Sequence, residues 1–242
     1  MPKTQSLFKA CLLLATLIFA GAVAADETSV KKAVQAKFPQ SSVESVIKTP
    51  YFGLYEVYID RDIFYTDEKL SYIILGNIFD GKTLQNLSAE RKRKLSAIKF
   101  DTLPLDLAIK IVKGNGKRKV AIFSDPDCPF CQRLEKDMVN VTDVTIYTFL
   151  FPIESLHPGS TDKARAIWCS TDRVKAWNDF MLNRALPEAN ASCDNPVDKI
   201  IDFGQSKGIR GTPTLIFADG KVIPGAIPTA QLEQILNGKD SD

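Results

Sequence analysis

The spacing of apolar and polar positions changes several times along this chain, and each change predicts a different element. Apolar residues recur with helical spacing over residues 30–38, and Pro39 ends the pattern. Segments rich in Val, Ile, Tyr and Phe follow at 42–48, 51–59 and 70–75, with turn-forming residues between them. This pattern predicts a small α+β domain over residues 25–86.

A charged segment rich in helix-forming residues follows this domain. Ser88 is a candidate N-cap for a helix over residues 88–99, which ends ahead of Pro104. We expect residues 87–104 to be a linker helix that leads to a second domain. The first domain is small enough to have a thin core, so it would gain from pairing with a second copy through an exposed strand edge.

The second domain, residues 105–242, alternates predicted strands and helices. A strand at 119–124, a helix from residue 128 and a strand at 141–151 form a βαβ unit. Helical patterns follow at 162–182 and 197–207. Strands at 214–217 and 221–223 form a hairpin across Asp219 and Gly220, and a last helix spans 229–236. The order β-α-β, helical insertion, β-β-α predicts an α/β thioredoxin fold.

Residues 1–24 have the layout of a secretory signal peptide. Lys3 and Lys9 precede an apolar run that ends in small residues, and the run is too short to cross a bilayer as a stable helix. Cleavage removes two of the 31 basic residues and none of the 29 acidic ones, so the mature chain is formally neutral. Neither a nucleic-acid partner nor a membrane surface is indicated by this balance.

Cysteine usage also indicates export. Cys11 leaves with the signal peptide, and the four cysteines that remain form two candidate pairs, as expected in an oxidising compartment. One pair is Cys128 with Cys131, and the other is Cys169 with Cys193, which flank a helical region. We predict that Cys169 and Cys193 form a structural disulfide, with a redox role for this pair as the alternative.

The motif Cys128-Pro129-Phe130-Cys131 stands at the predicted start of a helix, where Pro129 suits the first helical position. The free amides of the first turn and the helix dipole favour a thiolate at Cys128, which lowers its pKa from about 8.5. Cys131 lies one turn further on, placed to attack a mixed disulfide at Cys128. We predict an exposed Cys128 as nucleophile and Cys131 as resolving thiol in thiol-disulfide exchange.

A zinc site or an inert disulfide is the alternative interpretation of this motif. Zinc requires two further ligands, and the only histidine, His157, lies in a loop flanked by Pro and Gly. Cys169 and Cys193 do not form a second Cys-X-X-Cys. We therefore expect no metal and no cofactor, and we interpret His157 as a surface loop residue instead of a catalytic base.

A second motif, Gly211-Thr212-Pro213, leads directly into a predicted strand. A cis peptide bond at Pro213 would turn the backbone and leave groups of Thr212 free to pair with an extended substrate. An ordinary trans proline at the start of the strand is the alternative. We predict that Pro129, Phe130, Thr212 and Pro213 bind substrate.

Together these residues resemble the periplasmic disulfide isomerases of Gram-negative bacteria, the DsbC and DsbG family. The resemblance covers the whole mature chain and includes Phe123-Ser124-Asp125, Ala166-Ile167-Trp168-Cys169, Ala191-Ser192-Cys193-Asp194 and Val222-Ile223-Pro224-Gly225. It implies a V-shaped homodimer joined through the N-terminal domains, with a cleft that binds misfolded disulfide-containing exported proteins. It also implies chaperone activity, a cis Pro213, and a membrane reductase of the DsbD type that keeps Cys128 and Cys131 reduced.

The dipeptide between the cysteines departs from the family pattern. Family members often carry Gly-Tyr where this chain has Pro129-Phe130, and these positions help to set the redox poise. The dipeptide contains no His, which argues against the strongest oxidants. We therefore predict an isomerase and reductase, with a periplasmic thiol oxidase and a non-enzymatic dimeric holdase as alternatives.

Overall fold

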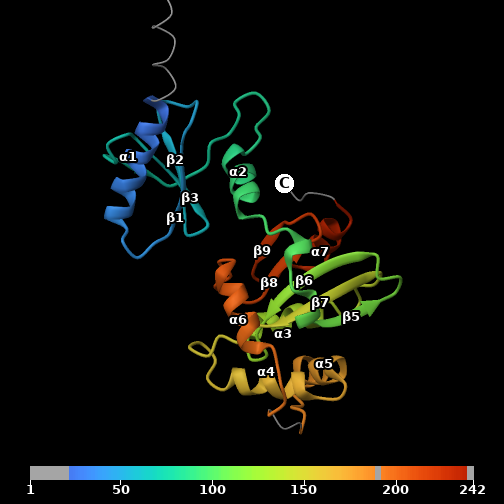
Figure 1. The fold of residues 1–242 in the computed structure, drawn as a ribbon. Helices are drawn as coiled ribbons and strands as arrows, with labels where there is room; N and C mark the ends of the chain where they lie inside the picture. Colours follow the sequence, from blue (N-terminus) through green and yellow to red (C-terminus); the bar gives the residue numbers. More distant parts are fainter. Residues whose placement is uncertain (1–21, 189–191, 239–242) are drawn as a thin grey trace, which may run out of the picture. The chain divides into compact units, whose positions relative to one another are not determined.

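The computed structural model of the chain describes residues 22–188 and 192–238. They fall into two compact units, residues 1–95 and 96–242, and each is described here by itself (Figure 1). Most of the predicted signal peptide lies outside the described residues. No helix in the described part of the chain is long and apolar enough to cross a membrane.

A four-stranded antiparallel sheet and one long helix form the first unit. Helix α1 (Ala22–Lys37) packs on a sheet whose order is β1-β2-β3-β4. Its strands are β1 (Val43–Lys48), β2 (Tyr55–Ile59), β3 (Asp62–Thr66) and β4 (Ile73–Ile74). Val30 and Val34 of α1 are fully buried against Val57 and Phe64 of the sheet. This apolar contact fixes the helix on one face of the sheet.

Strand β3 was not predicted from the sequence. Asp60 and Arg61, interpreted as a break between elements, form a two-residue turn with positive φ at both positions, and Ile59 pairs with Asp62 directly across it. Two central residues with positive φ match the twist of the flanking strands, so the segment is a tight hairpin. The predicted strand over 51–59 is correspondingly shorter, because it begins at Tyr55.

Helix α2 (Leu87–Ser96) follows the first sheet and is attached to it by polar contacts. The guanidinium Nε of Arg91 donates to the carboxylate of Glu56 at 2.9 Å, and the hydroxyls of Tyr65 and Ser88 lie 2.6 Å apart. The helix ends at Ser96, before the predicted end at residue 99. Ile98 is instead buried in the core of the second unit, where its N–H donates to the carbonyl of Gly220.

A five-stranded sheet of order β5-β7-β6-β8-β9 forms the centre of the second unit. Its strands are β5 (Ile109–Lys113), β6 (Arg118–Ser124), β7 (Val144–Leu150), β8 (Thr214–Phe217) and β9 (Val222–Pro224). Strands β6 and β7 are parallel, which confirms the predicted βαβ unit, and β8 and β9 form the predicted hairpin. Strand β5, antiparallel to β7, was missed, because its alternation of buried and exposed positions covers only five residues and an exposed Val112 breaks the apolar–polar pattern.

Helices cover both faces of this sheet. On one face, α3 (Pro129–Asp137), α4 (Ser160–Cys169), α5 (Arg173–Asn183) and α7 (Thr229–Leu236) contribute to a core with Val120 and Ile122. On the other, α6 (Val197–Ser206) and residues 98–108 pack with Ala121 and Phe123. Strand β6 is therefore apolar on both sides, as expected for a central parallel strand. The helix predicted over 162–182 is two helices, because Asp172 caps a new one by accepting from the Lys175 N–H.

Candidate functional site

The Cys-X-X-Cys motif lies where β6 ends and α3 begins. Cys128 is the N-cap of α3, with extended backbone angles, and Pro129 occupies the first helical turn. The carbonyl of Cys128 accepts the Gln132 N–H, while its own N–H donates to the carbonyl of Asp125. The sulfur of Cys128 thus lies at the positive end of a helix, where backbone amides and the dipole favour an anion.

Hydrogen bonds favour the thiolate form of Cys128. The largest effect on its pKa is the hydrogen bond with the Cys131 thiol, and the Thr212 side chain and the amides of Cys131 and Phe130 act in the same direction. Burial opposes them, because it penalises the charged form. The net result is a Cys128 pKa lowered to about 5, so this thiol is ionised at neutral pH.

Cys131 behaves in the opposite way. It is fully buried inside α3, and burial together with the adjacent Cys128 sulfur raises the pKa of its thiol. The side chain of Ser124 and the amide of Asp125 favour its thiolate without outweighing burial. The two thiols of the motif therefore have distinct states: Cys128 carries the charge, and Cys131 keeps its proton and donates a hydrogen bond to the Cys128 sulfur.

The exposure of Cys128 differs from the prediction. We expected an accessible thiolate, but the residue is only 3% exposed, whereas the neighbouring Phe130 is 60% exposed. The Thr212 carbonyl contacts the Cys128 sulfur at 3.3 Å and contributes to this cover. A substrate disulfide must therefore approach a sulfur that is almost fully covered, and Pro129 and Phe130 are the exposed residues next to it.

The segment that contacts Cys128 contains the second predicted motif. The peptide bond between Thr212 and Pro213 is cis, and β8 begins at the next residue. The hydroxyl of Thr214 donates to the carbonyl of Gly211 at 2.7 Å, and the Gly225 N–H donates to the carbonyl of Pro213 at 2.7 Å. These bonds fix the loop from both sides. The structure thus brings Thr212 to Cys128, which lies 84 residues earlier in the sequence.

Sequence reasoning missed the role of Asp125 and His157. Asp125 is fully buried, and its carboxylate accepts hydrogen bonds from the N–H groups of Asp127 (2.8 Å) and Ile153 (2.7 Å) and lies 2.8 Å from Nδ1 of His157. His157 is therefore a partner of the loop before the motif and not a free surface residue. One feature of the sequence could have indicated this pairing: Asp125 comes directly after a buried strand, in a chain that has a single histidine.

Asp127 lies in the same loop and is also paired. Its carboxylate binds Lys163 of α4 and Arg184, the C-cap of α5, and these bonds lower the Asp127 pKa despite partial burial. No group of three or more His, Cys, Asp or Glu side chains within residues 22–188 and 192–238 is placed to hold a metal ion.

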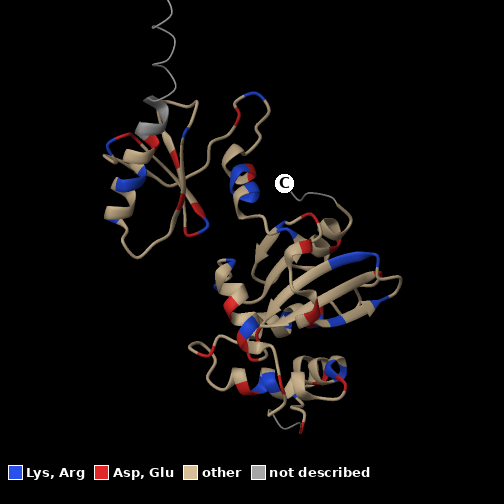
Figure 2. Cartoon of the chain, in the orientation of Figure 1, with Lys and Arg blue, Asp and Glu red and all other residues tan. Residues whose placement is uncertain are grey.

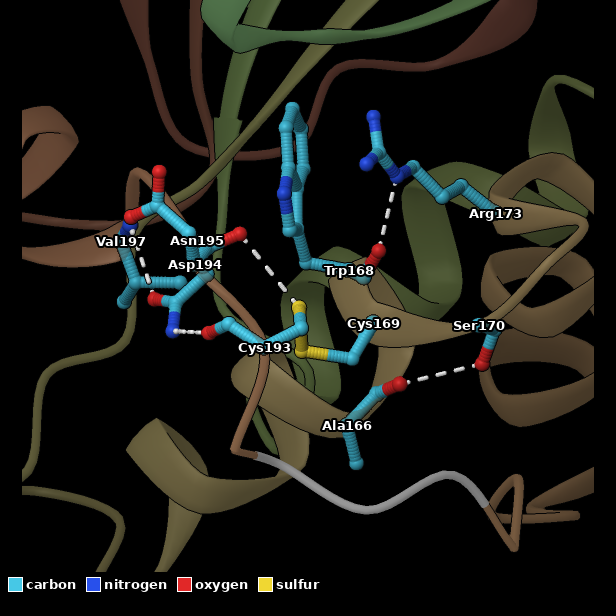
Figure 3. The surroundings of a disulfide bond; sticks show 9 residues. All are labelled: Ala166, Trp168, Cys169, Ser170, Arg173, Cys193, Asp194, Asn195 and Val197. Carbon is cyan, nitrogen blue, oxygen red and sulfur yellow. Dashed lines mark hydrogen bonds between the residues drawn. A yellow bond between two sulfur atoms is a disulfide. The ribbon is translucent and has the colours of Figure 1, made fainter.

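Cys169 and Cys193 form a disulfide that joins the end of α4 to the loop before α6 (Figure 3). Trp168 beside it is buried, and the guanidinium of Arg173 lies 3.9 Å from the centre of the indole ring and donates to the Trp168 carbonyl at 2.7 Å. The disulfide therefore adjoins a packed part of the insertion, an arrangement that suits a structural crosslink.

Comparisons with known proteins cover both units. Residues 105–239 match the family described as "Thioredoxin-like domain", and residues 21–89 match the "Disulfide bond isomerase protein N-terminal domain". The "Probable thiol:disulfide interchange protein DsbC" of Bordetella pertussis is 42% identical over 205 residues, which are 85% of this chain and 72% of that protein. The "Thiol:disulfide interchange protein DsbC" of Escherichia coli K12 is 25% identical over 230 residues, 93% of this chain and 94% of that protein.

A solved structure agrees with these sequence matches. The crystal structure of a disulfide interchange protein from Neisseria gonorrhoeae is 48% identical, with a TM-score of 0.55. The alignment covers 58% of this chain and 100% of the chain in that crystal structure. The match supports the thioredoxin-like fold described above.

Proposed function

We propose that Cys128 is the nucleophile of this protein and Cys131 its resolving thiol. The chain belongs to the DsbC family of thiol:disulfide interchange proteins and is a disulfide isomerase. The observation that carries this assignment is the opposite shift of the two thiols at one helix terminus. Cys128 has a pKa lowered to about 5, while burial raises the pKa of Cys131. The thiolate is the reactive form, so only Cys128 is ready to attack at neutral pH.

The reaction begins when the Cys128 thiolate attacks one sulfur of an incorrect substrate disulfide. A bond forms between Cys128 and that sulfur, the substrate disulfide breaks, and the other substrate sulfur leaves as a thiolate. In isomerisation, a different substrate thiolate then attacks the sulfur bound to Cys128. The correct substrate disulfide forms, Cys128 leaves as a thiolate, and no net oxidation occurs.

Cys131 provides a second exit from the mixed disulfide. Once Cys128 is bound to substrate, its negative charge is gone, and Cys131 loses the acceptor of its hydrogen bond. Deprotonated Cys131 attacks the Cys128 sulfur, the substrate leaves as a thiol, and the Cys128–Cys131 disulfide forms. The substrate is thereby reduced by two electrons. A membrane reductase of the DsbD type would supply two electrons to reduce the Cys128–Cys131 disulfide back to the dithiol.

Thr212 and Pro213 complete the proposed substrate site, with Pro129 and Phe130 as its exposed part. Thr212 contacts the Cys128 sulfur, so an extended substrate segment that pairs with this loop brings its own sulfur close to the nucleophile. The 60% exposed ring of Phe130 offers apolar contact to unfolded chains without sequence preference. We propose that substrates are misfolded, exported proteins with disulfides, processed in the periplasm after signal-peptide removal.

A homodimer formed through the first unit is the assembly we propose. Strand β4 is an edge of the four-stranded sheet, and the apolar residues at and beside it are exposed, among them Tyr72, Ile73, Ile74 and Leu75. Leu75 is 81% exposed. An open strand edge with apolar side chains is a ready pairing surface for a second copy. The domain limits we propose remain residues 25–86, 87–104 and 105–242.

Refolding of a scrambled substrate with several disulfides tests the catalytic assignment. Cys128→Ala is expected to lose isomerisation, whereas Cys131→Ala keeps part of it and accumulates mixed disulfides, visible on a non-reducing gel. Lys175→Met, an exposed change on α5, serves as the control. Unchanged recovery of native pairing by Cys128→Ala would favour a holdase, and a mainly oxidised Cys128–Cys131 pair in freshly isolated periplasm would favour an oxidase.

Light scattering on the full-length chain tests the assembly. The unaltered protein is expected at twice the chain mass at micromolar concentration, and Leu75→Arg at the mass of one chain. Val112→Arg, at an exposed position of β5 in the other unit, is the matched control and should remain dimeric. A monomeric unaltered protein would refute the dimer.

A further inference from the structure

The carboxylate of Asp127, the residue immediately before Cys128, is held by two cations. Its Oδ2 accepts from Nζ of Lys163 at 2.6 Å, and its Oδ1 accepts from Nη2 of Arg184 at 2.7 Å. The Asp127 side chain is only 13% exposed, while those of Lys163 and Arg184 are 33% and 44% exposed. Both carboxylate oxygens are thus occupied in a partly desolvated position, where ion pairs are screened less than on an open surface.

Both cations come from the helical insertion, not from the strands and helix that form the motif. Lys163 lies in α4, and Arg184 is the C-cap of α5, where its left-handed backbone ends the helix. The Arg184 guanidinium also donates from Nη1 to the Pro126 carbonyl at 3.0 Å and lies 4.0 Å from the centre of the Phe180 ring. One side chain therefore binds the backbone and the carboxylate of the loop before Cys128.

The position of this carboxylate has a chemical consequence. A negative charge next to a thiol opposes its ionisation, whereas a carboxylate neutralised by cations has a much weaker effect. Acidic and basic residues are interspersed along α4 and α5 (Figure 2), yet Lys163 and Arg184 converge on one carboxylate. The exposed pair of Lys175 with Asp179, by contrast, joins neighbouring turns of α5.

We propose that Lys163 and Arg184 are positioning residues for thiol-disulfide exchange, which neutralise Asp127 and fix the loop before Cys128, so that the helical insertion controls the reactivity of the nucleophile. The proposal rests on Cys128 being the attacking thiol. Among the described residues, the ionisable groups that face this loop include Lys163 from α4, Arg184 from the end of α5, Cys131 of α3, and His157 from the segment after β7, which pairs with Asp125.

The pH profile of Cys128 alkylation in the reduced, full-length protein measures this effect directly. Arg184→Met should leave Asp127 less neutralised, so the Cys128 pKa should rise from about 5 and alkylation at pH 5 should slow by about twofold to fivefold, as for a pKa rise of about half to one unit. Lys163→Met is expected to act in the same direction. Arg184→Lys keeps a cation and should recover much of the rate. Lys175→Met removes a charge from α5 without contacting Asp127 and should match the unaltered protein.

A double-mutant cycle decides whether the cations act through Asp127. In an Asp127→Asn background, Arg184→Met should leave the alkylation rate at pH 5 nearly unchanged, because the charge that Arg184 neutralises is gone. Equal slowing in both backgrounds, or no slowing in either, would overturn the proposal. Alkylation does not depend on turnover, so failure here is distinct from failure of the catalytic assignment, which would appear as full isomerisation by Cys128→Ala. Melting curves show whether each variant is folded.

Discussion

The sulfur of Cys128 lies 3.3 Å from the carbonyl oxygen of Thr212, a residue 84 positions later in the chain. This contact joins the start of α3 to the loop that enters β8 and places the nucleophile beside the backbone on which an extended substrate can pair. The Thr212 carbonyl contributes to the cover over Cys128, but as an acceptor it does not stabilise the thiolate. The groups that cover the sulfur include donors of hydrogen bonds to its thiolate.

The first prediction concerns the pH dependence of Cys128. Its pKa is lowered to about 5, so the thiolate is present above this pH and is lost as the pH falls through it. The rate of alkylation by iodoacetamide should therefore rise through pH 5 and reach a plateau before pH 7. An ordinary thiol, with a pKa of about 8.5, would still gain rate between pH 7 and 9. A rate that keeps rising there would show that Cys128 is not activated.

The second prediction concerns the hydrogen bond between the two cysteines. It is the largest contribution to the low Cys128 pKa, so Cys131→Ala should raise that pKa by about one to two units, the equivalent of one hydrogen bond to a charged group. Cys131→Ser retains a hydroxyl donor and should show a smaller rise. Absorbance of the thiolate at 240 nm against pH measures both. Identical curves for the two variants would exclude a donor role for Cys131.

The third prediction concerns the buried carboxylate of Asp125. Asp125→Ala leaves the N–H groups of Asp127 and Ile153 and the ring of His157 without their acceptor, and should lower the free energy of unfolding by on the order of 3 kcal/mol. His157→Ala removes one partner and should cost about 1 to 2 kcal/mol. Urea unfolding measures both.

Leu156→Ala is the control for these variants, because Leu156 is exposed and adjoins His157 in sequence. Its free energy of unfolding should match that of the unaltered protein. A His157→Ala variant as stable as this control would show that the His157–Asp125 contact does not contribute to stability.

The fourth prediction concerns the disulfide between Cys169 and Cys193. It closes a loop of 24 residues, so replacing both cysteines with Ser should lower the free energy of unfolding by about 3 kcal/mol in the chain-entropy model. At a temperature where the variant is folded, its isomerase activity should remain within about twofold of that of the unaltered protein, because this pair is proposed to be structural. Loss of activity without loss of stability would instead assign the pair a redox role.

Local patterns in the sequence were sufficient to predict much of the fold. The alternation of predicted strands and helices identified the βαβ unit around β6 and β7, and Pro129 marked the start of α3. Asp219 and Gly220 marked the hairpin of β8 and β9. Such features depend on backbone preferences over a few residues, and these act in the same way wherever the segment lies in the chain. The two missed strands, β3 and β5, are each five residues long, too short for a clear period.

Only the tertiary structure decided what surrounds the cysteines. The sequence located Cys128, Cys131, Thr212 and Pro213, but it could not show that the sulfur is 3% exposed or that Thr212 contacts it. Nor could it show that Asp125 binds His157 or that Asp127 binds Lys163 and Arg184. These partners are 32 to 57 residues apart. Hydrogen bonds, burial and charge depend on distance in space, so the residue types indicated the chemistry and the packing set its strength.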